Sequence, residues 1–285
     1  MPSSRLPQRQ LHPSDQQPGD LQPGDQQPGD RPPETEGEAA RPPQGQSSRA
    51  RPDLIDVLIT VACFLAAGLT VGILASTLGV DRVAPEVRAV LMPIVLAGQS
   101  LAFLIAFLWI VWHGRRLSLR QLGLGVLPPT WLKRGALWGA GAILPAILVN
   151  AITLILIGAE ETNPQVELLA PAGPSLWGFL VILPLVSILV PFVEELAFRG
   201  VLYGWLRQQL PQGLAILISA VIFAVAHGIP QLMPALILVG VLLARLRELE
   251  DSLWPCIAMH GVFNAVMTLV LFAALSAGVE PTQSL

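Results

Sequence analysis

The chain has 285 residues, of which 53% are hydrophobic and only 13% are charged. An average soluble domain carries roughly 25% charged residues, so this composition argues against a soluble globular protein. The formal net charge of −3 excludes little by itself, because the charges are distributed unevenly along the sequence. The two cysteines, Cys63 and Cys256, lie in apolar segments outside any CxxC pair, and we expect them to be small packing residues.

Residues 1–52 form a separate N-terminal region. They contain no Phe, Trp, Tyr, Ile or Val, and a five-residue unit recurs in them as QQPGD, LQPGD and QQPGD. Such a segment cannot bury enough apolar area to offset the entropy cost of ordering it. We therefore predict a disordered tail rich in Pro, Gln and Gly that is dispensable for chemistry, with a tether or partner-binding tail as the alternative.

Three long uncharged runs follow the tail, at residues 57–80, 89–112 and 135–159. Each run reaches the roughly 20 apolar residues that a helix needs to cross the hydrocarbon core. The first run is long enough to remain as an anchor, so no cleavable signal peptide is expected. Residues 53–170 are therefore predicted to hold the N-terminal transmembrane helices.

Residues 171–275 are predicted to form a transmembrane core of four further segments. The first of these segments covers about 176–205, and the last covers about 253–275. The uncharged stretch 208–244 between them is too long for one helix. Gly and Pro together are the strongest break signal available, so we split this stretch at His227-Gly228-Ile229-Pro230.

The segments together predict an all-α, multi-pass transmembrane helical bundle of about seven helices, with eight possible, followed by a short C-terminal tail at 276–285. If the helices alternate, one side of the bundle carries most of the basic residues: Arg49, Arg51, Arg115, Arg116, Arg120, Lys133, Arg134, Arg207, Arg245 and Arg247. The opposite side has only Arg82 and Arg88. The basic side is expected to be cytoplasmic, so we predict a cell-membrane protein with its N-terminus inside.

Ionisable residues within the apolar segments are the candidates for function. Such a group costs roughly 2.5 to 3.5 kcal/mol at membrane depth and persists only if it is paired, hydrated or used. The first three segments carry only Asp56, at an entrance, and a GxxxG pair, Gly135 and Gly139, which alone is a weak packing signal. Three later segments each deliver polar groups: Glu194, Glu195 and Arg199 in PFVEELAFRG, His227 in FAVAHG, and His260 and Asn264 in MHGVFN.

Helix geometry separates the two neighbouring glutamates. Glu195 and Arg199 are four residues apart, so they share a face and are expected to form a structural ion pair. Glu194 lies about 100° round the helix from Glu195 and has no obvious local partner. We therefore expect Glu194 to point into a cavity and to take part in chemistry.

The histidine segments show the same spacing. His260 and Asn264 are four residues apart, share a helix face and can both donate hydrogen bonds toward a carbonyl oxygen. Phe223 is four residues before His227 and is expected to pack on the same side. A lone membrane histidine is often only a hydrogen-bonding residue between helices, and this reading stays open for His227 by itself.

At these residues the sequence resembles the CPBP family of intramembrane proteases, which includes CaaX prenyl endopeptidases of the Rce type and bacterial relatives linked to bacteriocin processing and immunity. EELAFR fits the family pattern EExxxR, FAVAH fits FxxxH, and HGVFN fits HxxxN, in the same order. The match covers roughly residues 175–270. The resemblance implies a helical membrane fold with a conical, water-filled site open to one side.

The resemblance also implies roles for individual residues. Glu194 would act with His227 to activate a water molecule, and His260 and Asn264 would stabilise the oxyanion. Fixed donors aimed at developing negative charge can contribute about 3 to 4 kcal/mol each. Arg199 would help to hold the site together or contact the substrate.

Metal dependence stays open. Glu194, His227 and His260 could ligate zinc, but no HExxH pair lies on one helix, and we favour catalysis without a tightly bound metal over a divalent metal such as zinc. The expected partners are membrane lipids and a protein or peptide substrate, without nucleic acid.

The favoured function is therefore an intramembrane endopeptidase. One alternative is a catalytically silent membrane immunity or scaffold protein, although all of the motif residues are present. Another is a proton-coupled transporter that uses Glu194 and the histidines as a relay, although no internal repeat is visible.

Overall fold

The computed structural model describes residues 51–80, 82–115, 117–125, 127–157 and 175–278. These residues belong to one compact unit, Ser48–Leu285, and they form helices and turns without any strand. The predicted all-α transmembrane bundle is thus confirmed for the described residues. The predicted disordered tail lies almost entirely outside them, as do most of the C-terminal tail and the start of the predicted core.

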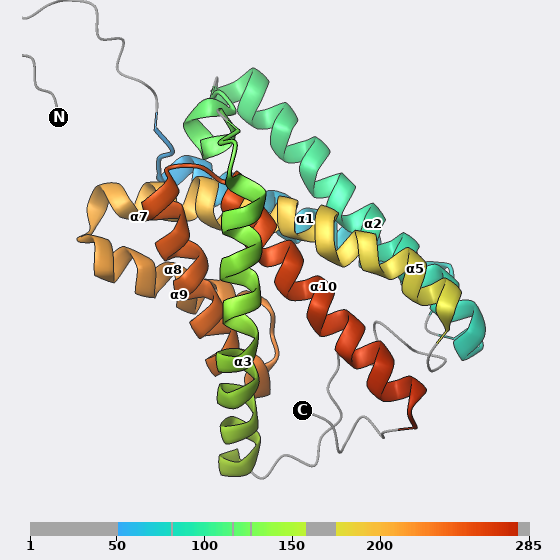
Figure 1. The fold of residues 1–285 in the computed structure, drawn as a ribbon. Coiled ribbons are helices and arrows are strands. Elements are labelled where there is room, and N and C mark those ends of the chain that lie inside the picture. The colour runs from blue at the N-terminus through green and yellow to red at the C-terminus, as the bar shows by residue number, and fades with distance from the viewer. Residues whose placement is uncertain (1–50, 81, 116, 126, 158–174, 279–285) are drawn as a thin grey trace, which may run out of the picture. The chain divides into compact units, whose positions relative to one another are not determined.

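Figure 1 shows the helices coloured in chain order, with α8 and α9 forming an antiparallel hairpin. In chain order they are α1 (Leu54–Thr77), α2 (Pro85–Trp109), η1 (Ile110–Arg115), η2 (Arg120–Leu124), α3 (Trp131–Ile157), α5 (Leu176–Pro184), η3 (Leu185–Leu189), α6 (Val190–Glu195), η4 (Leu196–Leu202), α7 (Tyr203–Gln209), α8 (Gln212–Ala226), η5 (Pro230–Leu232), α9 (Met233–Glu250) and α10 (Trp254–Ser276). Segments η1 to η4 are π-helical, and η5 is a 3₁₀ turn.

Five helical stretches among the described residues are long and apolar enough to cross a membrane: 54–77, 85–115, 131–157, 176–209 and 254–276. They correspond to the first four and the last of the predicted segments. The fifth predicted segment corresponds to α8, which is a shorter apolar helix. The predicted break in the 208–244 stretch is also found, because α8 ends at Ala226 and Gly228 has a φ of +67°.

The first transmembrane helix begins at a reciprocal cap. The Asp53 side chain accepts from the backbone N–H of Asp56, and the Asp56 side chain accepts from the backbone N–H of Asp53. These bonds satisfy amide donors that a helix start leaves unpaired. Arg115, at the end of η1, donates to both carboxylates and so ties the start of α1 to the end of the α2–η1 stretch. This pairing also explains how Asp56 can be buried at the membrane entrance.

Helix α10 lies against α3 on one side and against η3 on the other. A Cβ atom on Gly135 would lie 2.4 Å from the Ala258 Cβ, and one on Gly139 would lie 2.7 Å from the Met259 carbonyl oxygen. The GxxxG pair of α3 therefore allows the backbones of α3 and α10 to approach closely, in the manner of small residues at membrane helix interfaces. The packing of α10 sets where its polar residues lie.

The stretch 176–209 is one continuous helical run with two π-helical parts. Segment α6, which holds both glutamates, lies between η3 and η4. π-Helical turns widen a helix locally and are frequent at functional sites. Pro191 lies in the first turn of α6, directly after η3.

Candidate active site

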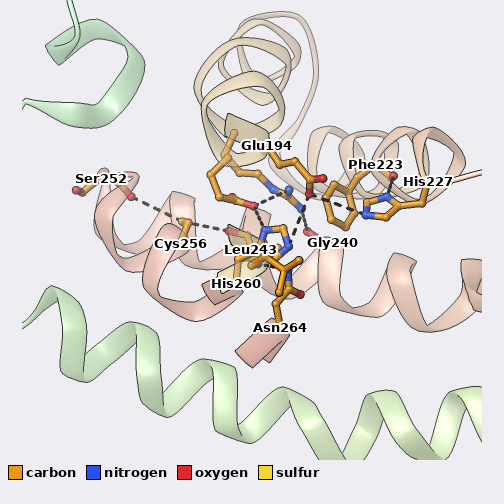
Figure 2. A network of polar contacts seen from close by, with 12 residues as sticks. Glu194, Phe223, His227, Gly240, Leu243, Ser252, Cys256, His260 and Asn264 are labelled. Carbon is orange, nitrogen blue, oxygen red and sulfur yellow. Dashed lines mark hydrogen bonds and ion pairs between the residues drawn. The ribbon is translucent and has the colours of Figure 1, made fainter. Parts of the chain in front are cut away.

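The two neighbouring glutamates of α6 lie in different environments. The Glu195 side chain is fully buried, whereas 19% of the Glu194 side chain is exposed. Figure 2 shows Glu194 within a network of polar contacts that also includes residues of α8, α9 and α10. The side chains of Glu194 and Glu195 point in different directions, because consecutive residues of a helix are rotated by about 100°.

Glu195 holds two partners through one oxygen. Arg199 Nη1 donates to Glu195 Oε1 over 3.0 Å, which confirms the predicted ion pair. His260 Nδ1 lies 2.9 Å from the same Glu195 oxygen. An ionised carboxylate only accepts hydrogen bonds, so His260 carries a proton on Nδ1 and directs Nε2 elsewhere. The sequence did not predict this contact between Glu195 and His260.

The buried Arg199 side chain connects α6 and η4 with two other helices. Its Nη2 donates to the Gly240 carbonyl of α9 over 3.3 Å. Its guanidinium carbon lies 4.3 Å from the centre of the Phe223 ring of α8, at cation–π distance. Arg199 is fully buried, so these contacts and the Glu195 pair replace the hydration that its charge would have in water.

His227 is the residue that caps the C-terminal end of α8. Its Nδ1 lies 2.8 Å from the Phe223 carbonyl oxygen, one of the acceptors that the last turn of a helix leaves unpaired. A carbonyl only accepts, so Nδ1 carries the proton in this contact and Nε2 presents a lone pair when the ring is neutral. His227 Nε2 lies 3.9 Å from Glu194 Oε2.

His260 brings the second imidazole to the same carboxylate oxygen. Its Nε2 lies 3.7 Å from Glu194 Oε2. The Phe223 ring contacts both imidazoles, with ring centres 4.6 Å from His227 and 5.8 Å from His260, so it packs beside His227 as predicted. Glu194 Oε2 is buried and has no direct hydrogen-bond partner within the described part of the chain.

Asn264 lies one turn after His260, on the same face of α10, and Figure 2 shows it beside the histidine. Its Nδ2 donates to the Val186 carbonyl oxygen of η3 over 3.0 Å. The structure thus brings together all seven residues predicted for the site: Glu194, Glu195, Arg199, Phe223, His227, His260 and Asn264.

Three backbone carbonyls also belong to this network, at Val186, Phe223 and Gly240. Sequence reasoning missed them, because a carbonyl is present at every residue and only the fold determines which one meets a donor. Cys256 adjoins the network and is buried with its thiol against the Leu243 and Ser252 carbonyls. Both cysteines are buried and unpaired, as expected for packing residues.

The predicted zinc ligands lie somewhat farther apart than the ligands of one zinc ion would. Two ligands of a tetrahedral zinc lie about 3.4 Å apart for bonds of 2.0 to 2.1 Å. Glu194 Oε2 is 3.9 Å and 3.7 Å from the two Nε2 atoms, and no group of three His, Cys, Asp or Glu in the described residues could hold a metal. The ring N–H contacts to Phe223 and Glu195 would suit metal-binding histidines, but they equally orient catalytic ones.

Comparison with known proteins identifies a family model that matches part of the chain. Residues 176–266 match the family described as Rce1-like, type II CAAX prenyl endopeptidase Rce1-like. No curated protein and no solved structure matches the chain. The matched residues run from the start of α5 into α10 and include every residue of the polar network named above. Residues 176–266 of this multi-pass membrane chain are thus similar to the Rce1-like members of the CPBP family of intramembrane proteases.

Proposed function

We propose that this protein is an intramembrane endopeptidase that hydrolyses a peptide bond with a water activated by Glu194 and His227. One observation carries the proposal: a single buried carboxylate oxygen, Glu194 Oε2, lies within 4 Å of the Nε2 atoms of two imidazoles from two other helices. Ionisable groups inside apolar helices are costly, and their convergence from three helices favours a functional site.

The water is proposed to bind between Glu194 and His227. Their separation of 3.9 Å is too long for a direct hydrogen bond and is a distance that one water can bridge. Glu194 would accept a proton from this water while the water oxygen bonds to the carbonyl carbon of the substrate. The neutral His227, with its proton on Nδ1, would accept a hydrogen bond at Nε2 and orient the water.

The tetrahedral intermediate then needs donors for its oxyanion. His260 already uses its Nδ1 proton toward Glu195, so it can donate from Nε2 only if it carries a second proton. We propose that His260 supplies this donor in its doubly protonated form, in which Nδ1–H faces Glu195 and Nε2–H faces the oxyanion. The Asn264 amide would supply the second donor.

Breakdown of the intermediate completes the reaction. The C–N bond breaks, and the leaving amine takes the proton that Glu194 accepted from water, which returns Glu194 to its carboxylate form. The products are a new carboxyl terminus and a new amino terminus. No step of this scheme needs a tightly bound metal.

Cleavage by the purified full-length protein in detergent tests the proposal, with a CaaX-type prenylated peptide and its unprenylated counterpart as substrates. We expect Glu194→Gln and His227→Ala each to lower kcat about 10²- to 10⁴-fold, the range for loss of a general base. Glu86→Gln, an exposed glutamate in the first turn of α2, is the matched control and should keep the full rate.

Two outcomes of this assay would contradict the proposal. Equal cleavage rates in all four proteins would show that Glu194 and His227 do not carry the chemistry. Loss of activity in a metal chelator, restored by zinc, would show that a metal takes the role assigned here to the two side chains alone.

A further inference from the structure

In the helical run that carries the glutamates, the Val186 carbonyl lacks a backbone donor. In η3 the backbone N–H of Val190 donates to the Leu185 carbonyl, five residues earlier. In the same register the next donor, at residue 191, would serve the Val186 carbonyl. Residue 191 is a proline and has no N–H. Val186 is buried, and an unpaired carbonyl in an apolar interior is costly.

Asn264 supplies the missing donor. Its Nδ2 lies 3.0 Å from the Val186 oxygen, although the two residues are far apart in the sequence. A carbonyl can only accept, so the nitrogen of the amide, and not its oxygen, must face Val186. This contact fixes the orientation of the whole amide group and leaves its second N–H and its oxygen for other partners.

Gly261 allows this contact to form. A Cβ atom at Gly261 would lie 2.3 Å from the Ser187 carbonyl oxygen, closer than real Cβ atoms come to any neighbour. Gly261 and Asn264 are three residues apart and share a face of α10. The absence of a side chain at Gly261 therefore lets α10 approach η3 closely enough for the Asn264 amide to reach Val186.

We propose that Pro191 is a positioning residue for Asn264. By lacking an N–H, Pro191 leaves the Val186 carbonyl to the Asn264 amide, which is thereby held beside His260 with one N–H free for the substrate. This inference rests on the oxyanion role proposed above for Asn264. It assigns a catalytic purpose to the proline that lies three residues before Glu194 in the same helical run.

A substitution at Pro191 has the same consequence in either helical register. With alanine at 191, a π-helical register lets the new N–H donate to Val186, whereas an α-helical register gives Val186 the N–H of Val190. A backbone donor then competes with Asn264 in both cases. We expect Pro191→Ala to lower kcat about tenfold with little change in KM, because an oxyanion donor acts mainly in the transition state.

A double-mutant cycle separates positioning from a general structural effect. Asn264→Ala should lower kcat about 10²- to 10³-fold, the range for one oxyanion donor. If Pro191 acts through Asn264, adding Pro191→Ala to Asn264→Ala should change kcat less than about twofold. Pro145→Ala, which removes an exposed proline inside α3, is the control and should leave kcat unchanged. If the double variant lost kcat by the product of the two single losses, the substitutions would act independently and the proposal would be overturned. An unchanged kcat in Pro191→Ala would also overturn it.

An NMR measurement tests the contact without any assay of activity. The chain has only three asparagines, Asn150, Asn163 and Asn264, so ¹⁵N labelling of asparagine side chains gives three amide groups. Asn264→Asp assigns the signal. In the unsubstituted protein one Asn264 amide proton should exchange slowly with water, and in Pro191→Ala, but not in Pro145→Ala, its shift and exchange rate should change. Fast exchange in the unsubstituted protein would disprove the hydrogen bond, whether or not the protein cleaves peptides.

Discussion

At the scale of single residues, Glu195 and Arg199 show how the membrane interior tolerates a full charge. Glu195 Oε1 accepts from Arg199 and from His260, and Arg199 also donates to the Gly240 carbonyl. The pair is fully buried, so each charge depends on the other. Arg199 is already paired with Glu195, so Glu194, one residue earlier, faces the two histidines instead.

Replacing the buried cation should therefore lower the free energy of unfolding more than replacing an exposed one. We expect Arg199→Met to lower the free energy of unfolding by about 3 to 5 kcal/mol, because it leaves the Glu195 charge buried without its main partner. Arg134→Met breaks a 2.6 Å pair with Glu250 in which 53% of the arginine side chain is exposed, so its cost should be at most about 1 kcal/mol. Denaturant unfolding in detergent compares the two variants, and equal costs would contradict the structural role of Arg199.

Part of this residue-scale picture follows from the sequence alone. The spacing of four predicts the Glu195–Arg199 pair, and the rotation between neighbours predicts that Glu194 points elsewhere. The contact between Glu195 and His260 does not follow, because it joins α6 to α10 and depends on the relative depth of two helices. The proposed catalytic roles themselves stay predictions until activity is measured.

At the scale of helices, the π-helical turns and the small residues position the site. The sequence predicts the break after His227, since Gly and Pro are strong local signals, but it gives little weight to the Gly135–Gly139 pair, since one GxxxG is common in membrane helices. In the structure this pair decides how closely α3 approaches α10, the helix that carries His260. Local signals are thus readable from sequence, whereas the importance of a close approach depends on the partner helix.

A methyl group at this interface should displace α10. Gly135→Ala would place a Cβ 2.4 Å from the Ala258 Cβ and 2.5 Å from the Pro255 carbonyl oxygen, so the two helices must move apart. We expect it to lower the thermal unfolding midpoint and the cleavage rate. Gly141→Ala on the same helix meets nothing within 4 Å and is the matched control, which should gain slightly in stability from better helix propensity. Equal behaviour of the two variants would show that the α3–α10 contact is not tight.

The cap of α1 predicts a loss of stability in acid. The pKa of Asp53 lies below its ordinary value of 3.8, chiefly because the backbone N–H of Asp56 donates to it and also because Arg115 lies beside it. A carboxylate with a lowered pKa in the folded state stabilises the fold above its ordinary pKa, and this contribution disappears as the pH falls below it. Asp53 is half exposed, so the effect should be small. The difference in unfolding midpoint between the unsubstituted protein and Asp53→Ala should be full at pH 7 and shrink below about pH 4, and a pH-independent difference would contradict this account.

At the scale of the whole molecule, the α8–α9 hairpin is short for a pair of membrane crossings. The 15 residues of α8 extend about 22 Å, and the uncharged part of α9, residues 233–244, extends about 18 Å. The hydrocarbon core is about 30 Å thick. The pairing of Arg134 in α3 with Glu250 in α9 places the two helix ends at one level, and Figure 1 shows the other end of α3 projecting beyond the hairpin. We therefore expect the tip that carries His227 to stop inside the membrane, so that α8 and α9 would be two helices of the bundle without being two of its crossings.

Non-helical backbone at membrane depth is tolerated only where it is buried in protein or lines water. Gly228 and Pro230, at the hairpin tip, are exposed, so the tip should line a water-filled path to the active site. We expect Pro230→Cys to react with a membrane-impermeant maleimide from the side on which Arg120→Cys reacts, and not from the side of Ala277→Cys. The unsubstituted chain, whose Cys63 and Cys256 are buried, gives the background. Since basic residues favour the cytoplasm, the reactive side should also be the cytoplasmic one. Labelling from the side of Ala277 would mean that the hairpin crosses fully, and absence of labelling from both sides would mean that no water reaches the tip.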